Sequence, residues 1–205
     1  MSKKIIGDVY LSKLHLKQLP IGLLNDVHVG GYFSCDYNNL TSLVGAPKTV
    51  GGDFSCIYNK LTSLVGAPSS VGGYFYCVNN NLTSLDGAPS SVGDFYCNSN
   101  NLTSLVGAPS SVGGNFLCIS NNLTSLAGAP SSVGGNFWCH NNNLTSLAGA
   151  PKTVGGTFSC NDNNLTSLAG APSSVGGDFY CSNNAVKFTK QQVRAVCDVK
   201  GKVYV

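Results

Sequence analysis

Glutamate is absent from this sequence, and charged residues of all kinds make up only 10% of its 205 residues. That share is far below the roughly 25% of ordinary globular chains, and it excludes disorder driven by charge repulsion. No apolar run approaches the ~20 residues that a membrane-spanning helix needs. The basic start of the chain also lacks an apolar stretch of signal-peptide length. These absences predict a soluble, cytoplasmic protein with no membrane partner.

The scarcity of titratable groups argues against an enzyme. With no Glu and only three His, few acids and bases can converge on a substrate. His140 follows Cys139, but neighbouring residues of a strand point to opposite faces, which excludes a Cys–His pair. The nine Cys include no Cys-x-x-Cys spacing of the kind that metal clusters use. We therefore expect no catalytic residue, no metal and no cofactor.

The few charges are unevenly distributed. Residues 1–31 hold four Lys and two Asp, residues 32–184 hold three Lys and six Asp, and residues 185–205 hold four Lys, one Arg and one Asp. A nucleic-acid-binding protein concentrates Lys and Arg on its working face. Here the cations lie at the two ends and the middle is mildly acidic, so no nucleic-acid partner is expected.

The sequence is dominated by a repeat. The unit Leu-Thr-Ser-Leu recurs every 21 residues, except for one step of 20. The short step comes from one missing Gly, at Val92-Gly93-Asp94, where the other repeats read Val-Gly-Gly. A fixed period of this length is the signature of a solenoid. The units begin at Leu40, Leu61, Leu82, Leu102, Leu123, Leu144 and Leu165.

Each repeat predicts inward-facing columns. Phe and Cys in Phe-x-Cys lie on the same face of a short strand, because side chains alternate along a strand. A third column of Asn is expected to bond backbone groups of neighbouring coils. The thiols would pack as small hydrophobes, since parallel side chains ~5 Å apart do not converge as a disulfide requires. The Phe column comprises Phe33, Phe54, Phe75, Phe95, Phe116, Phe137, Phe158 and Phe179; each Cys follows its Phe by two residues, and each Asn by five.

This unit resembles the leucine-rich repeat, L-x-x-L-x-L-x-x-N-x-L, with Phe in the second Leu slot and Cys in the third. Its length and its Leu-x-x-Leu-x-x-x-Pro continuation are most similar to the short repeats of bacterial type III effectors, over residues 6–186. The resemblance implies a β-rich solenoid of about nine coils of 20–21 residues, with a parallel concave sheet and a protein partner. Gly-Ala-Pro cannot form a helix interior, so the convex wall is expected to be non-helical.

We expect one continuous domain in three parts. Residues 1–31 form an N-terminal cap and a degenerate first repeat with a strand near 8–11, residues 32–186 the repeat array, and residues 187–205 a C-terminal cap. The tail resembles those of uncharacterised tailed-phage leucine-rich-repeat proteins, which implies a counter-defence or host-takeover inhibitor.

The C-terminal cap is predicted to contain a short helix. Thr189 and Gln192 have the spacing of a capping box, which marks a helix over about 189–196. Val193, Val196 and Ala195 would face inward from it. A final strand is expected over 203–205.

The positions that vary between repeats are those expected to face out of the concave sheet. In the middle repeats they bring together aromatic and apolar residues, including the only Trp. Exposed patches of this kind mark interaction sites, and Tyr and Trp dominate binding hot spots. Asp53 and Asp94 flank the patch and are expected to face Lys or Arg of the partner. The predicted surface comprises Asp53, Tyr74, Tyr76, Val78, Asp94, Tyr96, Leu117, Ile119, Trp138, His140 and Tyr180.

Other interpretations of these residues stay open. The aromatic side chains could be cross-strand pairs without a partner. The solenoid could assemble with itself as a structural component. A column of Thr could bind a regular surface such as ice or a glycan. That column comprises Thr41, Thr62, Thr83, Thr103, Thr124, Thr145 and Thr166.

Overall fold

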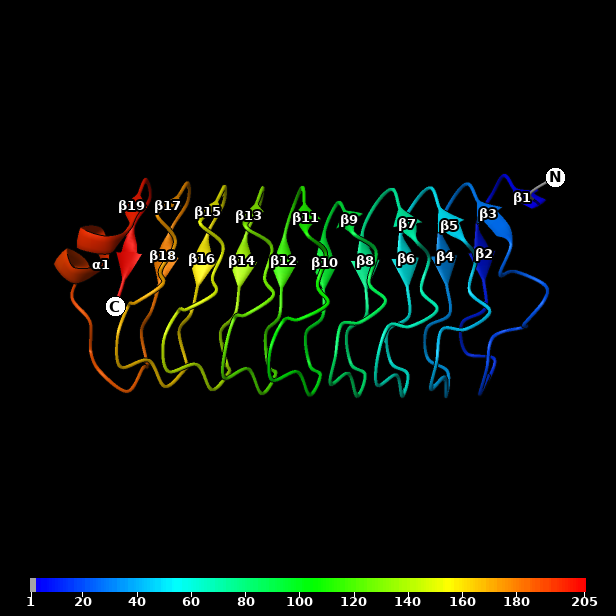
Figure 1. Cartoon of the computed structure of the whole chain (residues 1–205), viewed down its shortest axis with the longest axis horizontal. Coiled ribbons are helices and arrows are strands. Elements are labelled where there is room, and N and C mark those ends of the chain that lie inside the picture. The colour runs from blue at the N-terminus through cyan, green and yellow to red at the C-terminus, as the bar shows by residue number, and fades with distance from the viewer. Residues whose placement is uncertain (1–2) are drawn as a thin grey trace.

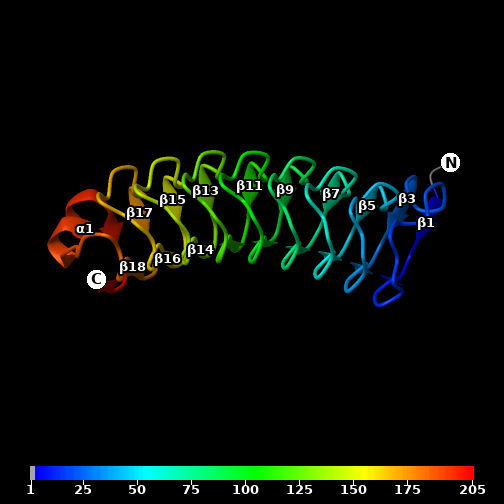
Figure 2. The same cartoon turned by 90° about the horizontal axis from the view of Figure 1, so that it is seen from below.

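The computed structural model describes residues 3–205, which wind into a parallel β-solenoid (Figure 1). Its main ladder is a ten-stranded parallel sheet, and the stack bends gently with this sheet along the inner side (Figure 2). Nine of its strands belong to the predicted coils, and the tenth, β20, comes from the C-terminal cap. The strands are β2 (Val9–Tyr10), β4 (Phe33–Ser34), β6 (Phe54–Ser55), β8 (Phe75–Tyr76), β10 (Phe95–Tyr96), β12 (Phe116–Leu117), β14 (Phe137–Trp138), β16 (Phe158–Ser159), β18 (Phe179–Tyr180) and β20 (Val203–Tyr204).

Over residues 3–205 the opposite wall contains no helix, but it is more regular than the sequence suggested, because it forms parallel ladders of its own. One has four strands and the other six, and short turns join them to the main sheet (Figures 1 and 2). The four-stranded ladder consists of β1 (Lys3–Ile5), β3 (Val27–Val29), β5 (Thr49–Val50) and β7 (Ser70–Val71). The six-stranded ladder consists of β9 (Ser91–Val92), β11 (Ser111–Val112), β13 (Ser132–Val133), β15 (Thr153–Val154), β17 (Ser174–Val175) and β19 (Asp198–Val199).

The outer wall breaks at the short repeat. The two outer ladders meet between β7 and β9, where the repeat lacks one Gly. Gly72 donates to the carbonyl of Val50, as the regular pattern requires, whereas Gly93 donates to Gly73. The main sheet runs through this point without interruption, since Phe95 pairs with Phe75 and Phe116. The missing residue therefore changes the outer ladder and leaves the pairing of the main sheet unchanged.

The predicted inward columns are confirmed. All eight Phe are fully buried, and consecutive rings lie 5.0–5.7 Å apart. The Cys of the repeats and the Leu of Leu-Thr-Ser-Leu are buried beside them. All nine thiols are free, which agrees with packing as hydrophobes. Cys197 in the cap is also buried, and burial raises its pKa to about 11.

The Asn column ties each coil to the one before it. The Asn121 Nδ2 donates to the carbonyls of Cys97 and Cys118 at 3.0 and 3.2 Å. Its Oδ1 accepts the backbone N–H of Leu102 at 3.1 Å. The other coils repeat this arrangement, so polar backbone groups at each turn are satisfied inside the stack.

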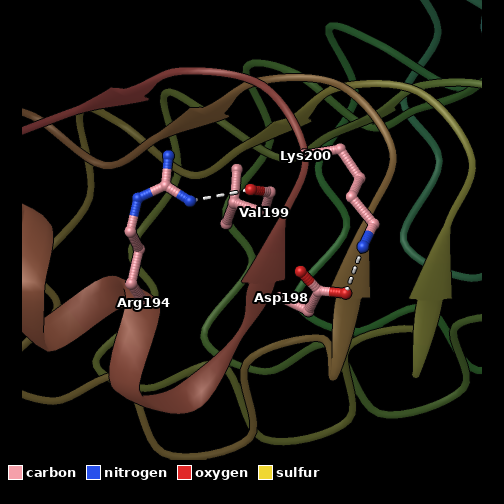
Figure 3. Close-up of polar contacts among 4 residues, drawn as sticks. All are labelled: Arg194, Asp198, Val199 and Lys200. Atoms are coloured by element: carbon pink, nitrogen blue, oxygen red, sulfur yellow. Dashed lines mark hydrogen bonds and ion pairs between the residues drawn. The ribbon is translucent and has the colours of Figure 1, made fainter.

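A helix covers the C-terminal end of the array. Helix α1 (Lys190–Val196) has the predicted capping box, and Val193 is fully buried. The prediction for Val196 and Ala195 is wrong, since both are exposed; with Val193 alone turned inward, a seven-residue helix presents one side chain to the core. The Arg194 side chain links the helix to β19, because its guanidinium donates to the carbonyl of Val199 at 2.8 Å (Figure 3).

The terminal strands carry their own ion pair. The Lys200 Nζ lies 2.7 Å from the Asp198 carboxylate (Figure 3), and both side chains are largely exposed. A pair exposed to this degree contributes little stability. The cap is therefore held by buried apolar side chains such as Val193, by the Arg194 contacts and by the pairing of β19 and β20 with β17 and β18.

Candidate functional site

One column on the concave face carries most of the variable residues. Strand register places the residue between each Phe and Cys directly beside its counterpart in the next coil. These side chains point away from the core, as predicted, because their neighbours Phe and Cys point inward. In order the column reads Tyr10, Ser34, Ser55, Tyr76, Tyr96, Leu117, Trp138, Ser159, Tyr180 and Tyr204.

The central aromatic residues form a packed but accessible group. Tyr76 and Tyr96 stack at 4.9 Å, and Tyr74 meets Tyr76 edge to face at 6.1 Å. Tyr74 is 43% exposed, while Tyr76 and Tyr96 are half-buried. Partial burial raises the pKa of Tyr76, and burial with a hydrogen bond to Asp94 raises that of Tyr96 to about 12. Both phenols therefore remain neutral hydrogen-bond donors at neutral pH.

The remaining apolar members of the predicted surface lie on the same face. Leu117 follows Tyr96 in the column, and Trp138 follows Leu117. The Leu117 and Trp138 side chains are both half-buried, so each keeps exposed surface that a partner could cover. Val78 and Ile119 follow Tyr76 and Leu117 by two residues, so they lie on the same face of the coil. They are also half-buried.

Asp94 bonds within the protein, whereas the prediction placed it at the exposed edge of the patch. It is only 6% exposed, and its oxygens accept the N–H of Asn115 at 2.8 Å, the Asn115 amide and the Tyr96 hydroxyl. Asp53 is half-buried and accepts the N–H of Tyr74 at 2.8 Å through one oxygen. Both Asp94 oxygens therefore accept hydrogen bonds from within the protein. Asp53 accepts one such bond through a single oxygen.

The position before each Phe has a structural role that the sequence interpretation missed. Asn115 accepts the N–H of Asn136, and Asn136 in turn accepts that of Thr157, as Asp94 does for Asn115. Such a ladder needs short side chains with an acceptor oxygen. The restriction of this position to Asp, Asn and Thr, with Tyr only at Tyr32 and Tyr74, was the available signal.

Three further residues of the concave face also belong to a scaffold network. Asp36 is 8% exposed and accepts the hydroxyls of Ser34 and Ser55 at 2.8 and 2.6 Å. This carboxylate thus fills the space that the two small side chains leave in the column. After Tyr10, the next aromatic residue of the column is therefore Tyr76.

An exposed aromatic pair lies beside the concave sheet and was not predicted. Tyr37 and Tyr58 stack at 4.7 Å, and the Lys13 ammonium lies 5.4 Å from the Tyr37 ring. Both Tyr have left-handed backbone angles, with φ of 53° and 52°. Equivalent positions in later coils hold Asn, Ser or Asp, and Asn and Asp tolerate this conformation better. A bulky residue at this slot is the signal that could have identified the pair.

A hollow of about 320 Å³ opens on the concave face near the C-terminal end. Trp138 and His140 line one side, Tyr180 the other, and Ser159 and Asn161 lie between them. The His140 Nδ1 lies 3.2 Å from the Ser159 hydroxyl, and partial burial lowers the pKa of His140. The imidazole is therefore mostly neutral at neutral pH.

The His140–Ser159 contact does not have the arrangement of a catalytic pair. The Ser159 hydroxyl donates its hydrogen to the Asn161 Oδ1 at 2.5 Å. A nucleophile needs a base that receives that hydrogen and a third group that orients the base. In the hydrogen bonds of residues 3–205, no carboxylate contacts His140.

Within residues 3–205, no group of three or more His, Cys, Asp or Glu is placed to hold a metal ion. Over the same range, no helix has the length and apolar character needed to span a membrane.

Comparison with known proteins shows the fold. No family model and no curated protein matches the chain. A solved structure that is similar is YopM from Yersinia enterocolitica WA-314, with a TM-score of 0.65 and 22% sequence identity. The match covers 86% of this chain but only 38% of that one. It gives no support to the phage resemblance of the tail. The buried columns, the parallel concave sheet and this match together show that the chain folds as a leucine-rich-repeat solenoid.

Proposed function

We propose that the protein is a binding module that recognises a protein segment through its concave face. The supporting observation is the run of half-buried side chains Tyr76, Tyr96, Leu117 and Trp138 in consecutive coils. Surfaces of this kind supply large apolar area together with polar handles, which is typical of binding hot spots. The small number of ionisable groups and the bonding of Ser159 favour binding over catalysis.

The partner that fits this face is basic and apolar. The concave positions of the array include Asp53 and Asp178 but neither Lys nor Arg. A segment with aromatic or aliphatic anchors and at least one cation would complement it in both shape and charge. The inhibitor role implied by the resemblance of the tail stays a prediction.

Selection from a displayed library of random peptides tests this proposal. We expect the retained peptides to be rich in Arg or Lys and in apolar residues. The Tyr76→Ala and Trp138→Ala substitutions together should weaken binding of those peptides at least about tenfold, because each removes a large anchor. Titration with purified peptides measures the change.

The matched control is Thr83→Ala with Thr124→Ala, at two exposed positions outside the concave column. This variant should bind as the parent protein does. If the face variant binds normally, or if both variants lose binding equally, the concave face is not the recognition surface.

Self-assembly is a second candidate function, and a different observation favours it. The N-terminal coil presents large exposed apolar side chains, including Ile6 at 85% and Ile21 at 63% exposure. Within residues 3–205, β1 and β2 are each paired on one side only. At the other end α1 packs beside β19 and β20. This asymmetry favours a closed pair of copies joined at their N-terminal ends over an open filament.

Sedimentation equilibrium over a range of concentrations tests this second function. A dimer that the Ile21→Lys and Leu23→Lys substitutions convert to a monomer would support it. Both residues are more than 60% exposed, so neither change should cost fold stability. A strict monomer at all concentrations would contradict it.

A further inference from the structure

The hollow near the C-terminal end is a one-residue vacancy in the concave column. From Tyr76 to Tyr204 every position holds a large side chain except Ser159. The earlier gap at Ser34 and Ser55 is closed by Asp36, which both hydroxyls contact. The Ser159 hydroxyl contacts Asn161 and His140, and Ser159 is 6% exposed, but the space that its small side chain leaves stays open as the hollow.

The dimensions of the vacancy suit one flat group. Trp138 and Tyr180 pair with Ser159 from its two sides, so they stand two strand spacings apart, or about 10 Å. A planar guest midway would lie about 5 Å from each. Neighbouring rings in this column already stack at that separation, with Tyr76–Tyr96 at 4.9 Å and Tyr180–Tyr204 at 4.4 Å. Because Tyr204 covers one face of Tyr180, the other face is directed toward the Ser159 coil.

The floor of the vacancy is polar. Thr157, Ser159, Asn161 and Ser182 contribute hydroxyl and amide groups to its lining. A purely apolar ring would cover these groups without satisfying them, which costs free energy. A guest with several donors in one plane would satisfy them.

The lining of the vacancy carries no fixed charge, and the carboxylates nearest to it in the chain are Asp162 and Asp178. Asp162 accepts the Asn161 amide, and Asp178 accepts the N–H of Lys202 through one oxygen while the other has only a long contact of 3.4 Å from Tyr180. No Lys or Arg lines the hollow. Both carboxylates lie outside the lining, and Lys202 lies beside Asp178 in the next coil, so the attraction for a cation comes mainly from the aromatic faces of Trp138 and Tyr180.

We propose that the vacancy at Ser159 is a receptor for one arginine side chain of the partner. The guanidinium is flat, positively charged and carries five donors, and it stacks on aromatic faces. It would lie between Trp138 and Tyr180 and donate toward oxygens of the polar lining, such as those of Thr157 and Ser182. This inference rests on the proposed function, because it assigns the cation of the partner to one place on the concave face.

The only Trp of the chain lines the vacancy, which makes its fluorescence a direct reporter. The probe is Nα-acetyl-arginine methylamide, titrated at constant ionic strength against its neutral isostere, the citrulline derivative. We expect saturable quenching by the arginine derivative and binding about tenfold weaker for citrulline, because the shape is kept and the cation–π attraction is lost. The corresponding lysine derivative should bind more weakly than arginine, since it lacks the plane.

Two substitutions at one position provide the matched pair. Ser159→Tyr fills the vacancy with the side chain that other coils carry and should abolish binding of the probe. Ser159→Ala keeps the vacancy open and should retain it. If Ser159→Tyr fails to fold, as checked by circular dichroism, Tyr180→Ala removes one wall instead and should weaken binding about tenfold.

Equal binding of the arginine and citrulline derivatives would overturn the inference. So would tighter binding of p-cresol, the neutral ring of a Tyr side chain, than of the arginine derivative. An undiminished titration of a folded Ser159→Tyr protein would overturn it as well. Each can be separated from a failure of the proposed function. The peptide selection with Tyr76→Ala alone, which lies outside the vacancy, would still show recognition by the concave face if the arginine site were absent.

Discussion

The protein is expected to unfold steeply between about pH 9 and pH 10.5, because its core contains a column of thiols. Burial raises the pKa of every thiol from Cys35 to Cys160 above its ordinary value of 9.0. In the unfolded chain the same thiols ionise near their ordinary pKa. The folded state therefore retains protons that the unfolded state releases. Stability is complete below the unfolded pKa and is lost as the pH rises above it.

The size of this effect is large because the thiols act together. At one pH unit above the unfolded pKa, each thiol removes about 1.4 kcal/mol of the free energy of unfolding. The seven fully buried thiols would remove about 10 kcal/mol together, which is comparable with the whole stability of an ordinary domain. Urea denaturation from pH 7 to pH 10.5, under reducing conditions and followed by circular dichroism, measures the slope.

The control replaces three central thiols, Cys77→Ala, Cys97→Ala and Cys118→Ala. This variant should be less stable at pH 7, because each substitution leaves a small cavity. Above pH 9, however, the free energy of unfolding should fall less steeply with pH, because unfolding of this variant releases three fewer protons. Tyr ionisation contributes equally to both proteins. An identical slope in the two would show that the thiols do not drive the transition.

Gly134→Ala is expected to destabilise the protein by about 3 kcal/mol or more, whereas Gly113→Ala should be nearly neutral. A Cβ at Gly134 would lie 2.0 Å from the carbonyl oxygen of Gly113, which is backbone and cannot rotate away. The N–H of Gly134 is itself bonded to Val112, so displacement would break the ladder. The cost exceeds that of ordinary overpacking, which is about 1–3 kcal/mol.

Gly113 provides the matched control one coil earlier. A Cβ there would meet nothing closer than the Val92 carbonyl oxygen at 4.0 Å, because the preceding repeat is one residue short. Its substitution should change stability by less than about 1 kcal/mol, and the reduced freedom of the unfolded chain could make the change favourable. Equal losses at the two positions in urea denaturation would show that contact between coils is not the cause.

The repeat frame could be predicted from the sequence because each coil contacts only its neighbours. A period of 21 residues then translates directly into columns, as Phe116 and Asn121 illustrate. The Ser-Val strands of the outer wall were missed, since two residues are too short for an alternating pattern. The orientation of Val196 was missed because a single turn of helix can pack with one residue, Val193, in the core.

The candidate site was predictable in position but not in every role. Alternation placed Tyr76, Tyr96 and Trp138 correctly on the concave face. Asp94 was misassigned, because the groups that occupy its oxygens include Asn115 of the next coil, and only the restriction of this position to short acceptor side chains indicates such bonds. The role of the surface in binding and the boundaries between caps and array stay predictions.

The even spacing of the concave column sets a rule for what can lie along it. Ser159 and Tyr76 are four strands apart, or about 19 Å, at the usual separation of strands. An extended peptide advances about 3.3 Å per residue, so six residues cover nearly the same length and return a side chain to the same side. A partner that seats an arginine at Ser159 would therefore carry its aromatic or aliphatic anchor six positions away.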